Sequence, residues 1–223
     1  MKRSIRILFL LLFALRLCAT EPFEGSFDMT VDAEGEKATL SVTTKEGDIH
    51  MKMKGGDAPG EMIFREGMST MLVLMPEQRM YMEMPLKGEM TGPGPGSAPP
   101  QEEPGEIPFK KTGRTREIQG YTAHEFIVEN EGGKTEIWAS EELGSMPFVH
   151  NPMFGGASDP MRKFTGLSAF FPLEVNGYKG DKPEYRMTIT RIEKKKVDDA
   201  LFQPPPGFQR FSMPGGMGGL MER

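Results

Sequence analysis

Alternation of apolar and polar residues, interrupted by glycines, is the feature that most constrains how this chain can fold. Residues 23–32, 37–44 and 48–54 each alternate with a period of two, and glycines follow the second and third runs. Period-two runs that end in glycine turns about every ten residues predict an antiparallel β meander. Further strands are expected over residues 61–65, 70–75, 78–84, 115–118, 121–129, 134–139, 170–176 and 184–194.

Three segments break this pattern in a way that predicts loops and tails. Residues 88–108 are rich in glycine and proline and predict a flexible surface loop within the domain. Residues 130–134, with the sequence NEGGK, predict a hairpin turn. Residues 212–223 predict a disordered tail. We therefore expect a single domain over residues 21–211.

Short helices are expected at three places. Ser140 with two following glutamates is typical of a helix start, and Gly144 would end that helix after about one turn. Residues 159–167, with a proline at the first helical position, predict a second short helix. Residues 197–202 predict a helical turn before three consecutive prolines.

The N-terminus has the layout of a secretory signal peptide. Basic residues precede an apolar run over residues 7–15, and small residues follow it. We expect residues 1–20 to be removed, after Ala19 or Thr20, which places the protein in the periplasm with no spanning segment in the mature chain. Cys18 is the only cysteine and would leave with the signal, so the mature chain would contain no disulfide.

Charge and composition exclude several classes of protein. The net charge of −5 is mixed along the chain, without the basic stripe of a nucleic-acid-binding protein. The three histidines are far apart in sequence and form no zinc-binding motif, and no GxSxG elbow is present. We therefore predict a protein that is not an enzyme and has no cofactor or resident metal.

Methionines are concentrated in one predicted hairpin. Seven of the 19 methionines lie between residues 68 and 90, and the hairpin itself reads MLVLMPEQRMYMEMP over residues 71–85. A two- or four-residue loop would place Met71, Val73 and Met75 on the same face as Met80, Met82 and Met84. A three-residue loop would instead join Leu72 and Leu74 to those last three methionines. Pro76 suits the first central position of a type I turn, which favours a loop of three or four residues. In either register Met80, Met82 and Met84 are expected to be buried, and residues 71–75 are apolar on both faces, so both faces must be covered.

Three interpretations of the methionines remain open. Methionine fills irregular gaps in protein cores, and it also forms adaptable surfaces for apolar ligands or partners. Thioethers also bind copper(I), and a copper site would take its further ligands from His50, Met51 and Met53.

Three stretches together resemble a known family. They are MLVLMPEQRMYMEM, GYTAHEFIVENEGGKTEIWASEELG, and FPLEVNGY with the later YRMTITRIEKKKVDDALFQPPPGF. They resemble a family of exported bacterial proteins classified as domain of unknown function 4412, over most of residues 23–211. The ending VDDALFQPPPGF also resembles the LolA/LolB-like lipoprotein-carrier superfamily. That resemblance implies a mainly β (α+β) fold, in which a curved antiparallel sheet forms a half-barrel with a few short helices on its concave side.

The resemblance and the residues together suggest a non-enzymatic periplasmic binding protein. Its ligand would be a lipid, a lipoprotein acyl chain or another apolar molecule. The residues expected to line the interior are Met71, Val73, Met80, Met82, Met84, Trp138, Phe170 and Phe171. The alternative is an envelope structural domain with a filled core, no ligand and a protein partner in the envelope.

Overall fold

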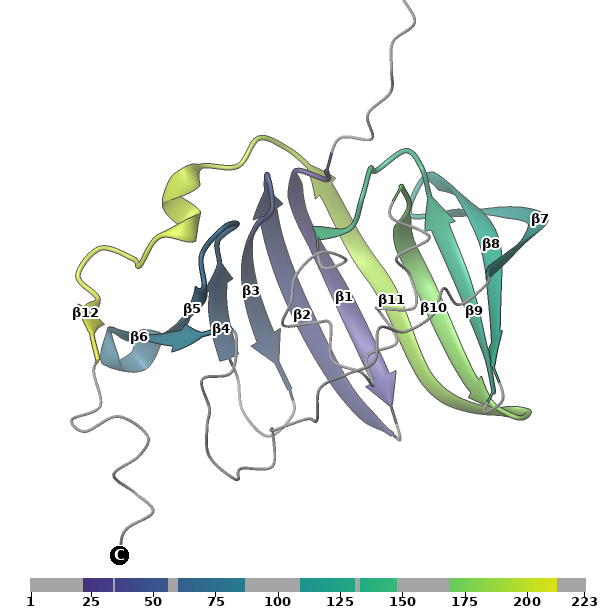
Figure 1. Cartoon of the computed structure of the whole chain (residues 1–223), viewed down its shortest axis with the longest axis horizontal. Helices are drawn as coiled ribbons and strands as arrows, with labels where there is room; N and C mark the ends of the chain where they lie inside the picture. The colour runs from purple at the N-terminus through teal and green to yellow at the C-terminus, as the bar shows by residue number, and fades with distance from the viewer. Residues whose placement is uncertain are drawn as a thin grey trace, which may run out of the picture.

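A single sheet of twelve strands dominates the computed structural model (Figure 1). The structure describes residues 22–33, 35–55, 60–86, 109–130, 133–147 and 169–211. The predicted signal peptide at 1–20, loop at 88–108, helix at 159–167 and tail at 212–223 all lie outside these ranges.

The strands follow one another as two meanders that meet in the middle of the sheet. The order across the sheet is β12-β6-β5-β4-β3-β2-β1-β11-β10-β9-β8-β7. All neighbouring strands are antiparallel except β12, which runs parallel to β6. The strands are β1 (Gly25–Ala33), β2 (Glu36–Lys45), β3 (Asp48–Lys54), β4 (Gly60–Phe64), β5 (Thr70–Met75), β6 (Met80–Pro85), β7 (Phe109–Ile118), β8 (Tyr121–Asn130), β9 (Gly133–Ser140), β10 (Phe171–Lys179), β11 (Lys182–Lys194) and β12 (Gln209–Arg210).

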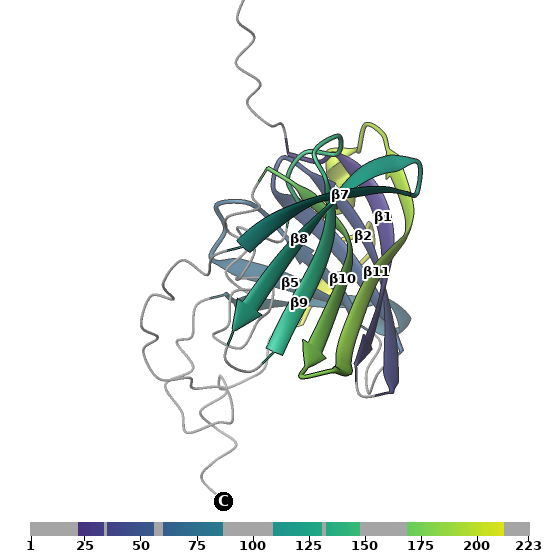
Figure 2. The same ribbon diagram turned by 90° about the vertical axis from the view of Figure 1, so that its right-hand side faces the viewer.

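The sheet is strongly curved and open, which confirms the predicted half-barrel (Figure 2). Side chains from strands as distant as β5 and β8 belong to one buried cluster, which lies on the inner face of the sheet. The short helices expected on the concave side are not confirmed. Within the described ranges, the helical elements of three or more residues are the 3-10 turns Pro76–Gln78 and Asp199–Phe202.

The inner face carries the main hydrophobic core. Phe23, Phe27 and Phe171 are almost completely buried, and their ring centroids lie 5.1 to 5.9 Å apart. Gly25 lies beside these rings, on the same strand as Phe27. It has a φ of +148°, and a Cβ there would lie 2.2 Å from the carbonyl oxygen of Glu193, so the close approach of β1 to β11 requires glycine.

The segment after β11 crosses the outer face of strands β3 to β6 and forms a smaller core there. We call residues 197–208 of this segment the strap. Val197 and Phe202 of the strap are buried against Ile63, Leu72 and Leu74, which share the outer face. The strap explains why residues 71–75 are apolar on both faces, as the sequence predicted.

Polar contacts fix both ends of the strap. Its start is fixed by Glu24, whose carboxylate accepts a hydrogen bond from the Val197 amide at 2.9 Å. Within the strap, the helical turn predicted over 197–202 is present as the 3-10 turn Asp199–Phe202, and Asp198 caps it by accepting a hydrogen bond from the Ala200 amide. Beyond the strap, the amides of Gln209 and Phe211 donate to backbone carbonyls of Arg79 and Tyr81.

The prediction for β7 was too short. The strand begins at Phe109 rather than at 115, and a register shift interrupts its pairing with β8 between Lys111 and Thr115. Most side chains of β7 are exposed, so the apolar alternation that identifies a half-buried strand is missing from its first half. The predicted helix at Ser140 is also wrong, since Ser140 ends β9 and a tight turn follows, with Gly144 donating to the carbonyl of Glu141 at 3.4 Å.

Candidate ligand-binding face

The loop of the methionine hairpin has four residues, which settles the register that the sequence left open. Met75 pairs with Met80, Val73 with Met82 and Met71 with Met84. The loop is the 3-10 turn Pro76–Gln78 followed by Arg79 in a left-handed conformation, with φ of 51°. Because directly paired residues of antiparallel strands lie on the same face, all six side chains lie on the inner face.

The same face continues across the neighbouring strands. Met62 on β4 pairs with Val73 on one side and with Met51 on the other, and Met53 follows two residues later on β3. Seven of these inner-face residues are half-buried, and we call them the methionine strip. They are Met53, Met62, Val73, Met75, Met80, Met82 and Met84.

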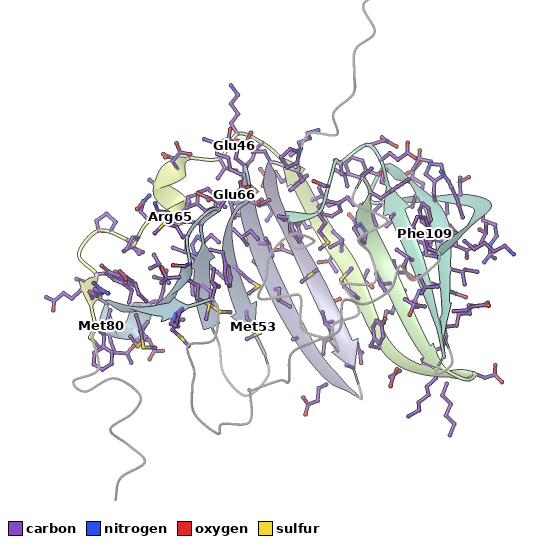
Figure 3. All side chains as sticks on the ribbon, viewed as in Figure 1. Glu46, Met53, Arg65, Glu66, Met80 and Phe109 are labelled. Atoms are coloured by element: carbon purple, nitrogen blue, oxygen red, sulfur yellow. The ribbon has the colours of Figure 1, made fainter. Side chains whose placement is uncertain are left out.

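The methionine strip is more exposed than the core residues that lie beside it. Met51 and Met71, which lie beside it, are only 3% and 7% exposed and belong to the buried core. The strip therefore forms the accessible margin of the core at the β3–β6 end (Figure 3, where Met53 and Met80 are labelled). Met80, Met82 and Met84 were expected to be buried, but they are only half-buried because they line this margin rather than the centre.

Phe170 and Phe171 lie far across the sheet from the strip. Phe171 starts β10 and is fully buried against Phe23 and Phe27, so it packs the core itself. Phe170 is half-buried and packs edge-on against Phe126, with centroids 4.8 Å apart. Both phenylalanines contact the core as expected, but Phe171 presents no accessible surface to a ligand.

Trp138 does not line the interior, so that expectation is wrong. It pairs with Glu125 on β8 and with Glu174 on β10, whereas its neighbour Ile137 pairs with the core residue Phe126. Trp138 therefore lies on the outer face, where the guanidinium of Arg116 stacks over its ring at 4.1 Å.

The copper constellation considered from the sequence is divided between the two faces. His50 lies on the outer face, while Met51 and Met53 lie on the inner one, because neighbouring residues of a strand point in opposite directions. The Nε2 atom of His50 is 2.7 Å from Oε1 of Glu61. Burial lowers the pKa of His50 below 6.5, which outweighs the opposing effect of Glu61. Within the described ranges, no group of three or more His, Cys, Asp or Glu side chains could hold a metal ion.

Two parts of the inner face were missed by the sequence reasoning. Met53 and Met62 extend the strip beyond the hairpin onto β3 and β4. The alternation of apolar and polar residues in these strands would have assigned both methionines to the inner face once the register was known. The second part lies at the other end of the sheet, where Phe109, Lys111 and Phe126 come together with Phe170. Only Phe170 of these four residues was expected from the sequence to line the interior, because β7 lacks the apolar alternation that would have placed Phe109 and Lys111 there.

Solved structures with a similar arrangement include several proteins of low sequence identity. An uncharacterized conserved protein from Thermus thermophilus is 11% identical, with a TM-score of 0.46, over 84% of this chain and 90% of that chain. MucB in complex with MucA(peri) is 9% identical, with a TM-score of 0.47, over 81% of this chain and 54% of that chain. A LolA superfamily protein from Nitrosomonas europaea is 10% identical, with a TM-score of 0.33, over 83% of this chain and 91% of that chain.

Comparison with family models gives a match over most of the chain. No curated protein matches the sequence. No helix in the described ranges is both long enough and apolar enough to cross a membrane. The model of a domain of unknown function, DUF4412, matches residues 23–208, which include every strand from β1 to β11 and the whole strap. The chain therefore belongs to the DUF4412 family.

Proposed function

We propose that this chain is a non-enzymatic periplasmic binding protein that holds an apolar molecule, such as a lipid or a lipoprotein acyl chain, against the methionine strip. The observation that carries the proposal is that seven apolar side chains on the inner face of a curved sheet are only half-buried. The signal-like N-terminal sequence supports export.

The chemistry of the strip suits a flexible apolar guest. Six of its seven residues are methionines, which are unbranched, polarizable and able to adapt to different shapes. At Gly60 the strip has no side chain of its own, and a Cβ placed there would lie 3.8 Å from the terminal methyl groups of Met53 and Met62. An acyl chain that covers such a surface gains about 0.8 kcal/mol for each methylene group that leaves water.

The ligand itself is the first measurement. Protein purified from a periplasm is examined by native mass spectrometry, and its bound molecules are extracted and identified. We expect a co-purifying lipid and binding of a fluorescent fatty acid by the stripped protein. The proposal is refuted if the purified protein carries no ligand and the stripped protein does not bind the fatty acid.

A pair of substitutions locates the site. Met82→Gln removes a thioether from the centre of the strip and should weaken binding of the fluorescent fatty acid by roughly tenfold, since burial of one large apolar side chain is worth about 1.5 kcal/mol or more. Met68→Gln is the matched control, because Met68 is 47% exposed in the turn between β4 and β5, outside the strip. Equal affinities of the two variants would place the ligand elsewhere.

The alternative is an envelope interaction domain with a filled core, and one observation favours it. The phenylalanines at the centre of the inner face pack tightly against one another and are almost fully buried. In that case Met82→Gln would weaken binding to a protein of the envelope, and no lipid would be found with the purified chain.

A further inference from the structure

A lysine lies among aromatic rings on the inner face, at the end of the sheet opposite the methionine strip. The Nζ atom of Lys111 is 5.7 Å from the centroid of Phe126 and 5.4 Å from that of Phe170. Phe109 completes the group, with its ring centroid 5.8 Å from that of Phe126. We call these four residues the aromatic corner (Phe109 is labelled in Figure 3).

The position of Lys111 on the inner face follows from the strand pairing. Lys111 pairs with Phe126, which is buried in the main core, whereas Lys110 pairs with Ile127 and so lies on the outer face. An ammonium group on the apolar side of a sheet is unusual, because its desolvation is unfavourable unless a partner compensates. Here the side chain keeps 45% of its surface exposed, so the ammonium group stays partly hydrated, and the two rings add a cation–π attraction.

The ammonium group keeps the capacity to bind an anion. Its Nζ lies 3.6 Å from Oε1 of Glu141, which is a loose ion pair rather than a hydrogen bond. The side chains of Lys111 and Glu141 are 45% and 58% exposed, so an incoming anion can reach Nζ and the carboxylate can turn away into water. Lysine offers three donors, and anionic oxygens form its strongest hydrogen bonds.

The aromatic corner and the methionine strip border the same buried core from opposite ends of the inner face. Phe170 at the corner and Val73, Met62 and Met84 of the strip all pack against the same buried cluster. A molecule with an anionic group at Lys111 would therefore meet apolar side chains at once, since the exposed Phe109 and the half-buried Phe170 lie at this end of the inner face.

We propose that Lys111 binds the anionic head of an amphipathic ligand whose apolar chain lies on the inner face of the half-barrel. This inference rests on the proposed apolar binding and adds the chemical class of the ligand, which carries a carboxylate or a phosphate. Phe170, whose ring centroid is 5.4 Å from Nζ of Lys111, would lie beside the head group.

Three ligands with the same chain test the head group. Oleate, oleyl phosphate and oleyl alcohol are titrated against the stripped protein in slightly alkaline buffer, below their aggregation concentrations. We expect at least one anion to bind about tenfold more tightly than the alcohol, as one charge-assisted hydrogen bond would give. The two anions distinguish a fatty acid from a phosphate-bearing lipid as the natural source.

Substitutions at neighbouring positions assign the effect to Lys111. Lys111→Met should abolish the preference for the anion while the alcohol still binds. Lys110→Met removes the same charge from the outer face of the same strand and should keep the preference, as should Lys111→Arg. Glu141→Gln removes the competing carboxylate and should increase anion affinity. Thermal unfolding of each variant checks that the fold is retained.

The outcomes separate the two proposals. If all three oleyl compounds bind equally, or if Lys111→Met retains the preference, the inference about the head group is wrong and apolar binding stands. If none of the three binds, the proposed function itself fails, and the head-group inference fails with it. A preference that is lost equally in Lys110→Met and Lys111→Met would show a general effect of charge and would also overturn the inference.

Discussion

Replacement of Glu125 should lower the free energy of unfolding, and the size of that loss should depend on pH. Its side chain is only 1% exposed, although it lies on the outer face of β8. The irregular part of β7 folds over it, and its carboxylate accepts hydrogen bonds from the hydroxyl of Thr112 and from the guanidinium of Arg114, whose Nε is 2.6 Å away. The carboxylate therefore fixes the irregular segment of β7 onto the sheet.

The size of the effect can be worked from these contacts. Glu125→Gln keeps the shape of the side chain but removes the charge that holds the Arg114 guanidinium. A hydrogen bond to a charged group is worth about 1.5–3 kcal/mol, and loss of one partner of a buried pair costs about 3–5 kcal/mol. Arg114 is 64% exposed and can be solvated by water once its partner is gone, which keeps the cost near the lower values. We expect a loss of about 2–3 kcal/mol near neutral pH.

The loss should shrink on acidification. Burial raises the pKa of Glu125, but the hydrogen bonds from Arg114 and Thr112 outweigh it and hold that pKa below the ordinary 4.5. A carboxyl group with a lowered pKa in the folded state contributes its stability above the ordinary pKa and loses it as the pH falls through the folded value. The difference between the wild type and Glu125→Gln should therefore be largest at neutral pH and decline below about pH 4.5.

Urea denaturation gives the measurement directly. Trp138 is the only tryptophan of the chain and pairs with Glu125, so its fluorescence reports this part of the sheet. Glu129→Gln is the control, because Glu129 is exposed on the same strand and its replacement should change stability by no more than about 0.5 kcal/mol. Arg114→Met should also destabilise the protein, since it leaves the buried carboxylate without its cation. A loss that is the same at pH 7 and at pH 3, or equal to that of Glu129→Gln, would refute the reasoning.

Two further predictions concern the outer face. Phe202→Ala should destabilise the protein by about 3 kcal/mol in chemical denaturation, because it empties the buried centre of the strap's core, while Leu201→Ala, at a 46% exposed position beside it, should have little effect. A similar cost for both would show that Phe202 does not anchor the strap. The folded protein lowers the pKa of His50, so the unfolded chain binds a proton at this side chain more readily than the folded one does. Stability should therefore fall as the pH drops below about 6.5, and His50→Gln should flatten that part of the stability profile. An unchanged profile would mean that protonated His50 is tolerated beside Glu61.

The meander could be predicted from the sequence because its strands are buried on one face and exposed on the other. That contrast produces the alternation in β1, β2 and β3, and it located these strands to within a few residues. The same reasoning failed for the first half of β7, since a strand that is exposed on both faces has no alternation to read.

The candidate site was only partly predictable, because alternate residues of a strand point to opposite faces and the sequence does not show which face is the inner one. The sequence left the hairpin loop at three or four residues, and a shift of one residue moves every side chain to the other face. For Trp138 the same ambiguity led to an error, because Ile137 and Trp138 are both apolar neighbours and only the pairing with Phe126 shows which one faces inward. The aromatic corner depends on contacts between β7, β8 and Phe170, which are distant in sequence.

The pairing of β1 with β11 has a consequence for how the chain can fold as it is made. β1 to β6 form a meander of local hairpins, and β7 to β11 form another in which residues 141–170 connect β9 to β10. Each half can therefore assemble from strands that follow one another in sequence. The two halves join only when β11, whose residues are 182–194, reaches β1. Until then, the backbone N–H and C=O groups on one side of β1 remain unpaired and can bind a strand of another chain. A chain in which β11 has not yet formed would therefore expose an unpaired edge strand, and aggregation through that edge would compete with completion of the sheet.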